Sequence, residues 1–163
     1  IPIERRSEGL ALMMSVAENM NLLVLNSLKT AGFLSPAREK ANAHHWISEC
    51  QIKTPSIGTL CSNLSGGNQQ KTVISKWLSS RVRFLILDHP TRGVDVGAKD
   101  EIYKIIRRLA REGIGMLIMC DTLEEDIGLA NRMIVMKDGL LVKEVDSPLQ
   151  NKPSPQEIIS LIV

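Results

Sequence analysis

Short apolar runs and one amphipathic segment alternate in the second half of the chain. Two continuous apolar runs, at 84–87 and 116–119, have the length and composition of buried β-strands. Between them, residues 98–112 carry apolar side chains at the helical positions 102, 105, 106 and 109. A strand, a helix and a strand in this order predict a βαβ crossover in a parallel sheet, with strands covered on both faces.

The first part of the chain has the pattern of amphipathic helices instead. Residues 15–30 begin with Ser15 and Glu18, the spacing of a capping box, and carry apolar residues on one face. Ser35 is a second predicted cap, followed by a helix from Pro36 to Cys50. No buried strand is expected before about residue 75.

The end of the chain predicts a strand pair and a last helix. Two short apolar segments, 133–136 and 140–145, flank the tight turn Asp138-Gly139. A short helix is expected at 156–162 after a turn-rich stretch. The predicted fold class is therefore α/β, with a helical subdomain over 1–75 and a mainly parallel-sheet part over 76–163.

Composition narrows the function classes. The 163 residues suffice for one core, and 20 Lys and Arg against 18 Asp and Glu give a formal charge of +2, which provides no basic footprint for nucleic acid. Cys50, Cys61 and Cys120 lack CxxC spacing and are expected to be reduced thiols. No apolar stretch reaches the roughly 18 residues of a membrane span, so membrane association would depend on a partner.

A serine and two glycines precede the predicted helix 69–80. Bare backbone amides at a helix start, with the positive end of the helix dipole behind them, form an anion site. On its own, Ser65-Gly66-Gly67 is more often an ordinary helix entry than an anion site.

A carboxylate ends the first predicted strand. Asp88 follows the run 84–87, at the strand end where α/β proteins place ligand-binding groups, although a lone Asp there can also cap a turn. His89 comes next, and a neutral imidazole can accept a proton near neutral pH.

Three segments together resemble the ATPase domains of ABC transporters. Leu64-Ser65-Gly66-Gly67-Asn68-Gln69-Gln70 resembles their signature motif in its sugar-importer form, 83–88 resembles Walker B, and 91–99 resembles the D-loop. The resemblance covers nearly the whole chain. It implies a partial P-loop NTPase fold, from the C-terminal half of the tandem ATPase subunit of a ribose- or galactose-type importer.

The resemblance also implies roles for individual residues. In this family the signature contacts the γ-phosphate of ATP held by a partner domain, and the D-loop lies on the dimer seam. The implied nucleotide-binding residues are Ser65, Gly66, Gly67, Gln69 and Asp95. Asp88 would hold Mg²⁺ through water, so ATP and Mg²⁺ are the implied cofactors of the full-length dimer.

Two catalytic positions depart from the family pattern. His89 stands where active members have a catalytic glutamate, and Asp121 stands at the place of the switch histidine. An acid beside the γ-phosphate would repel it, although Asp121 is equally an N-cap for a helix beginning at Thr122. The site of this half is therefore expected to be degenerate.

The phosphate-gripping motif GxxxxGK(S/T) occurs nowhere in the sequence. Residues 2–10 resemble the segment that precedes the helical subdomain, so the chain is expected to start just after the glutamine-bearing loop. Alone it should bind ATP very weakly and be inactive.

The implied partners are a second ATPase domain or the N-terminal ATPase half, a transmembrane permease facing residues 15–50, and indirectly a solute-binding protein. The implied location is the cytoplasmic face of the cell membrane. Two alternatives remain at this point: a non-catalytic module that docks on a permease or an ATPase, and an ATPase of DNA repair or chromosome maintenance. The latter class carries coiled-coil or zinc insertions that the sequence lacks.

Overall fold

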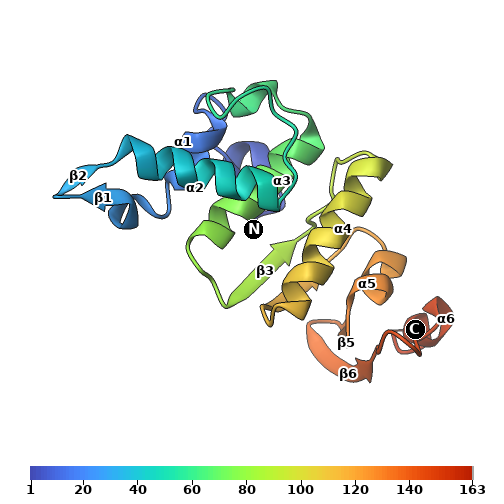
Figure 1. Ribbon diagram of the computed structural model, residues 1–163. Coiled ribbons are helices and arrows are strands. Elements are labelled where there is room, and N and C mark those ends of the chain that lie inside the picture. The colour runs from blue at the N-terminus through green and yellow to red at the C-terminus, as the bar shows by residue number, and fades with distance from the viewer. Residues whose placement is uncertain (163) are drawn as a thin grey trace.

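Three helices pack together at one end of an elongated molecule (Figure 1). In the computed structural model, which describes residues 1–162, these are α1 (Val16–Asn21), α2 (Pro36–Glu49) and α3 (Gly66–Ser79). The predicted caps are confirmed: Ser15 forms a complete capping box with Glu18, and the Ser35 side chain accepts from the Arg38 amide. Short-range cap signals in the sequence therefore located the helix starts.

The predicted helix over 15–30 is wrong in its second half. The helix α1 ends at Asn21, and a 3₁₀ turn (Leu25–Leu28) leads into a small hairpin of β1 (Lys29–Thr30) and β2 (Phe33–Leu34). Asn and Ser are weak helix formers, and the hairpin turn uses Ala31 and Gly32 at positive φ, a conformation that glycine adopts readily. The remaining short elements are a π-helix at Arg5–Gly9 and a 3₁₀ turn at Cys61–Asn63.

A single core joins the helices to the sheet. Val73 and Ile74 of α3 pack with Val16 of α1, and the same buried cluster includes Leu85, Leu87, Ile102, Ile105, Ile106 and Leu109. The predicted domain boundary at 75/76 falls inside α3, so both predicted parts share this core.

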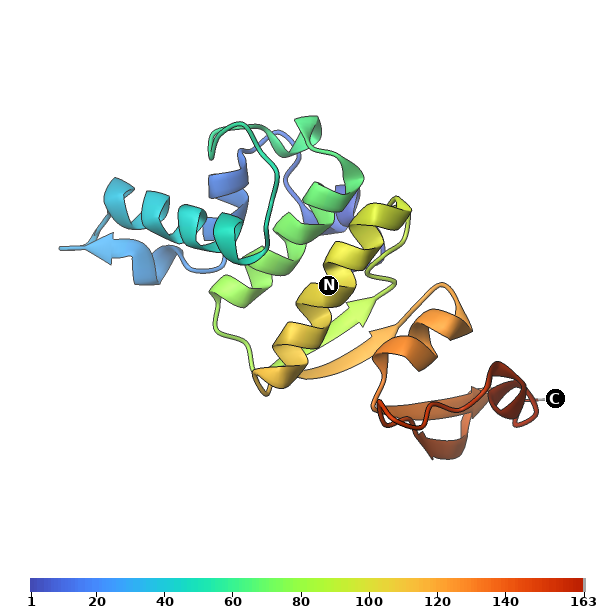
Figure 2. The same cartoon turned by 45° about the vertical axis from the view of Figure 1, so that its right-hand side comes forward.

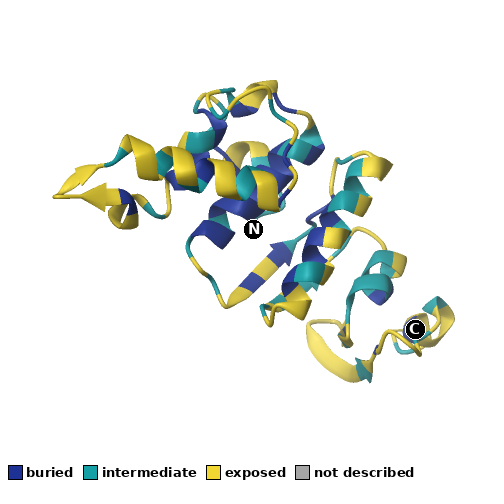
Figure 3. Cartoon of the chain, viewed as in Figure 1, coloured by how far each residue is buried: buried dark blue, intermediate teal, exposed yellow. Residues whose placement is uncertain are grey.

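The central crossover is confirmed as a parallel βαβ unit. The strands β3 (Phe84–Asp88) and β4 (Gly115–Met119) pair in parallel, with α4 (Val96–Arg111) between them in sequence. The prediction that both faces of these strands are covered is wrong. In residues 1–162, helices cover one face of the strand pair and leave the other face exposed (Figure 3). The exposed fractions on the open face are 57% for Phe84, 51% for Ile86, 44% for Leu117 and 41% for Met119.

The last part forms a small layer of its own beside the sheet (Figure 2). It comprises α5 (Leu123–Leu129), the antiparallel pair β5 (Arg132–Lys137) and β6 (Leu140–Asp146), and α6 (Pro155–Ile159). The predicted turn is confirmed, with Asp138 and Gly139 both at positive φ. The last helix is shorter than the expected 156–162. Ile127, Val135 and Ile158 form a separate buried cluster here.

Candidate functional site

A groove of about 260 Å³ lies between the first turns of α3 and α4. Both helices start on the same side of the molecule, near the top of the view in Figure 2. The lining residues come from the two helix starts and one loop: Lys53, Ser65, Gly67, Asn68, Asp95, Gly97, Ala98 and Glu101. Three of the predicted nucleotide-binding residues, Ser65, Gly67 and Asp95, therefore share one hollow.

The α3 wall of the groove presents a serine at a helix start. Ser65 is the N-cap, and its hydroxyl oxygen accepts from the Asn68 amide at 3.5 Å and from Asn68 Nδ2 at 3.0 Å. The amides of the first turn of this 14-residue helix have no intrahelical acceptor and carry the positive end of the dipole. This wall can therefore accept an anion.

The α4 wall presents a carboxylate at the second helix start. Asp95 is the N-cap of α4 and accepts from the Ala98 amide at 3.0 Å. A cap that binds its own helix is held in place, so Asp95 has a fixed position across the groove from Ser65.

The two walls are held together so closely that only glycine fits at 67. A Cβ at Gly67 would lie 2.4 Å from the Ala98 Cβ. Arg5 crosses beside them, donating from Nη1 to the Arg92 carbonyl at 2.6 Å and from Nη2 to the Gly93 carbonyl at 3.0 Å. Gly66 is also closely packed, because a Cβ added at this position would lie 2.7 Å from the Arg5 Nη2. Helix α3 and the loop before α4 are thus fixed relative to each other.

The structure does not bring Gln69 into the groove. Its side chain is fully buried, and Nε2 donates to the Cys61 carbonyl at 2.9 Å. Asn68 lies at the groove instead, because a step of one residue turns a helix by about 100°. Gln69 is therefore not among the lining residues of the groove, and its role in nucleotide binding stays a prediction. Asn68, Lys53 and Glu101 are lining residues that the sequence pattern did not reveal.

A second group of predicted residues meets at the carboxyl ends of β3 and β4. His89 Nδ1 lies 2.6 Å from Asp88 Oδ1, and His89 Nε2 lies 3.9 Å from Asp121 Oδ1. The His89 backbone is in the left-handed region at φ 48° and donates to the Met119 carbonyl at 2.8 Å. Parallel strands place their ends side by side, which accounts for this meeting.

The alternative reading of Asp121 as a helix cap is wrong. Thr122 is the N-cap of α5, and its hydroxyl accepts from the Glu125 amide at 3.3 Å. The helix begins at Leu123, one residue later than expected. Asp121 thus remains a side chain directed toward His89 and is about one-third exposed.

An unpredicted acid supports the loop between these two groups. Glu125 accepts from Thr91 at 2.8 Å and from Lys99 at 2.6 Å. Burial raises the pKa of Glu125, but hydrogen bonds from Lys99, Thr91 and Tyr103 outweigh it and hold the pKa below its ordinary value. Burial and the nearby Glu125 raise the pKa of Tyr103 to about 12. Glu125 is therefore an ionised anchor for the loop that leads to Asp95.

Asp88 suits Mg²⁺ only as part of a larger ligand set. It offers a carboxylate oxygen at a strand end, the donor that Mg²⁺ prefers, and it is partly exposed. Among residues 1–162, no three His, Cys, Asp or Glu side chains gather into a metal-binding group. The ion's remaining ligands would then be water and phosphate oxygens.

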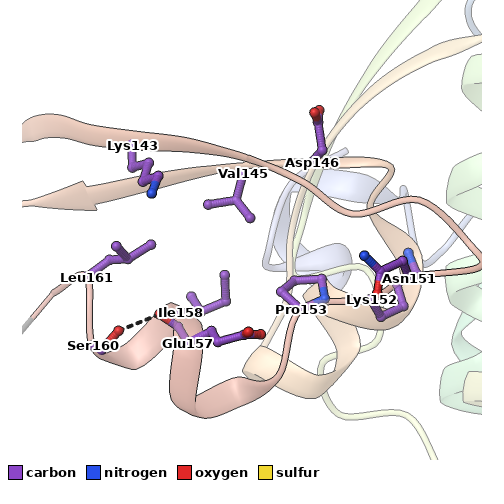
Figure 4. Close-up of a pocket in the computed structure, with 10 residues that line it drawn as sticks. All are labelled: Lys143, Val145, Asp146, Asn151, Lys152, Pro153, Glu157, Ile158, Ser160 and Leu161. Carbon is purple, nitrogen blue, oxygen red and sulfur yellow. Dashed lines mark hydrogen bonds between the residues drawn. The ribbon is translucent and has the colours of Figure 1, made fainter.

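A larger hollow of about 450 Å³ lies between β6 and α6 (Figure 4). Lys152, at one end of it, donates to the Ala130 carbonyl at 2.5 Å and to the Ser147 carbonyl at 2.8 Å. Its ammonium is therefore already hydrogen-bonded to backbone carbonyl groups of this chain. None of the predicted site residues lines this hollow. The groove between α3 and α4 is the stronger candidate.

The fold and these two residue groups are consistent with the ABC transporter family. The model of the ABC transporter family matches residues 4–92, and the chain belongs to this family. It is 42% identical over 158 residues to the ribose import ATP-binding protein RbsA 1 of Burkholderia ambifaria, covering 97% of this chain and 31% of that protein. It is 44% identical over 146 residues to the arabinose import ATP-binding protein AraG of Yersinia pestis, covering 89% and 28%. The chain thus spans less than a third of either relative.

Solved structures confirm the fold class. An ATP-binding cassette of an ABC transporter superposes with a TM-score of 0.70 at 21% identity, covering 99% of this chain and 65% of that one. A dimeric bacterial ABC transporter cassette gives a TM-score of 0.68 at 21% identity, covering 84% and 58%. The described helices include none that is long and apolar enough to cross a membrane.

Proposed function

We propose that this chain is part of the ATPase subunit of an importer for a sugar or similar small solute. The groove between α3 and α4 would complete an ATP site whose phosphate-gripping loop belongs to a second ATPase domain. The observation that carries the proposal is the joining of Ser65, Gly67 and Asp95 in one groove at two helix starts. The likeness to ribose and arabinose import ATP-binding proteins supports the choice of solute class.

The groove's own residues suggest what each side chain does. The Ser65 hydroxyl and the first amides of α3 would donate to phosphate oxygens, with the helix dipole favouring the negative charge. Asp95 would face the partner domain across the seam. ATP, when bound, supplies the phosphoryl group, and Mg²⁺ neutralises its charge. Close packing at Gly67 and the Arg5 bridge keep these donors in place.

We also propose that the centre at Asp88, His89 and Asp121 contributes little hydrolysis. The His89 ring is already engaged by the Asp88 carboxylate at 2.6 Å and lies near the Asp121 carboxylate. Two carboxylates around the imidazole add negative charge where a γ-phosphate would lie. A site with this arrangement is expected to hydrolyse ATP slowly or not at all.

The open surfaces suggest where partners bind. The apolar side chains of Leu22, Leu23 and Phe33 are 37%, 42% and 80% exposed in the helical part, which we propose faces the permease. The permease would connect the chain to the inner face of the membrane and, indirectly, to a solute-binding protein. The open face of β3 and β4 would receive the rest of an ATPase cassette, since this chain covers 58% to 65% of the solved cassettes.

Complex formation with a partner ATPase domain tests the proposal. The partner carries an intact GxxxxGK(S/T) loop and a hydrolysis-blocking substitution, and size-exclusion chromatography follows association with this chain. We expect ATP-dependent co-elution that Ser65→Arg abolishes, because arginine would fill the groove. Lys40→Met, a change on the exposed side of α2, is the control and should co-elute like the wild type. Co-elution in the absence of ATP, or co-elution of the Ser65→Arg variant, would contradict the proposal.

A non-catalytic docking module is the second candidate. The His89 and Asp121 departures from the family pattern favour it. ATP-independent co-elution with the partner, unaffected by Ser65→Arg, is the result that this candidate requires.

A further inference from the structure

One cation stands at the rim of the groove without a role in the signature motif. Lys53 lies in the loop after α2, lines the groove, and has a side chain that is 77% exposed. Its Nζ lies 3.0 Å from Glu101 Oε1. An exposed ion pair of this kind adds little to stability, so stability alone does not account for a lysine at the edge of the groove.

The backbone of Lys53 is fixed to the signature helix. The Lys53 amide donates to Asn68 Oδ1 at 2.9 Å, while Asn68 Nδ2 donates to the Ser65 hydroxyl at 3.0 Å. One asparagine therefore connects the loop cation to the serine that caps α3. Two residues earlier, the Gln51 carbonyl accepts from the buried ammonium of Lys71 at 2.6 Å, which anchors the loop a second time.

The acid that holds Lys53 has a second, permanent partner. Lys71, only 1% exposed, donates to Glu101 Oε2 at 2.8 Å. If Lys53 left Glu101, that carboxylate would keep the Lys71 ammonium as its partner. Lys53 is thus the one lysine of the pair that can move to another anion at small cost.

We propose that Lys53 is a phosphate-contacting residue of the groove, exchanging Glu101 for a phosphate oxygen when an oligophosphate binds at Ser65. This inference rests on the proposed function, because it assumes that the groove receives phosphate. The exchange forms and breaks only ion pairs, and Lys71 keeps Glu101 neutralised throughout. The flexible stem of lysine suits a point contact to phosphate.

An NMR titration of the 163-residue chain with inorganic triphosphate at constant ionic strength tests this. Amide shifts of residues 66–68 report the groove, and those of residue 53 report the loop. We expect Lys53→Met to weaken binding roughly two- to fivefold, the effect of one exposed charge pair. Lys53→Arg should bind like the wild type, and so should Lys40→Met, which removes an equal charge away from the groove.

The outcomes separate this inference from the proposed function. Unchanged binding in Lys53→Met, with binding lost in Ser65→Glu, which places a negative charge in the groove, would overturn the role of Lys53 and leave the groove as a phosphate site. Equal weakening in Lys53→Met and Lys40→Met would reduce Lys53 to general surface charge and also overturn it. No shift at residues 66–68 in the wild type would overturn this inference, whereas the proposed function is decided by co-elution with the partner ATPase domain.

Discussion

At the residue scale, the buried ammonium of Lys71 is a group that is costly to leave without a counter-ion. Glu101 holds it at 2.8 Å, and Lys71 is 1% exposed whereas the Glu101 side chain is 29% exposed. Removing the acid leaves a charge without a counter-ion in the interior, whereas removing the lysine leaves an acid that Lys53 and water still reach. Substituting Glu101 should therefore destabilise the protein more than substituting Lys71.

We expect Glu101→Gln to lower the free energy of unfolding by about 2 kcal/mol, and Lys71→Met, which keeps an apolar stem of similar length, by less than about 1 kcal/mol. Urea denaturation followed by circular dichroism measures both. Equal losses in the two variants would contradict the asymmetry.

The same carboxylate gives a pH dependence with a defined sign. Hydrogen bonds from Lys71, and then from Lys53, hold the pKa of Glu101 below its ordinary value of 4.5. A lowered folded-state pKa stabilises the fold above the unfolded value and loses that effect as pH falls through the folded value. The stability difference between wild type and Glu101→Gln should thus be complete at pH 6 to 7 and shrink below about pH 4.5. A difference that stays constant down to pH 3 would show that the charge of Glu101 is not its source.

At the element scale, the crossing of α3 and α4 depends on the absence of a side chain at Gly67. A methyl group there would approach the Ala98 Cβ to 2.4 Å, so the helix starts would have to separate. We expect Gly67→Ala to cost about 1 to 3 kcal/mol, as overpacking does, and to displace the groove amides in an NMR spectrum.

Gly128 in α5 is the matched control, because a Cβ there meets nothing within 4 Å. Gly128→Ala should be neutral or stabilise the chain by up to about 1 kcal/mol, since alanine favours a helix more than glycine. A Gly67→Ala protein as stable as Gly128→Ala would show that the two helix starts tolerate separation.

Elements that depend on contacts between residues close in the sequence could be predicted, and elements that depend on distant contacts could not. Helix starts at Ser15 and Ser35 were readable because a cap and its partner lie three residues apart. The helix expected over 69–80 begins earlier, at Gly66. The meeting of His89 and Asp121 was not predicted, although parallel strands place their carboxyl ends side by side. Residues 22–34 and the buried face of Gln69 were missed, since turn geometry and the rotational position on a helix depend on packing with distant segments.

At the scale of the whole molecule, residues outside the segment 64–70 also hold the candidate site in place. Glu125 could not be found from the sequence, because its partners Thr91 and Lys99 lie 34 and 26 residues away. The exposed face of β3 and β4 could not be predicted either, because the strand pattern does not say whether further helices or strands pack on that face. The core that crosses the predicted 75/76 boundary shows that the helical part and the sheet stabilise each other.

The division of labour between the two residue groups is the central claim, and ATP turnover tests it most directly. This chain is combined with a partner ATPase domain carrying GxxxxGK(S/T), and magnesium-ATP hydrolysis is measured for the wild type, Ser65→Arg and His89→Ala. We expect Ser65→Arg to abolish the stimulation by this chain and His89→Ala to leave it unchanged. Turnover that survives Ser65→Arg, or that disappears with His89→Ala, would contradict the account.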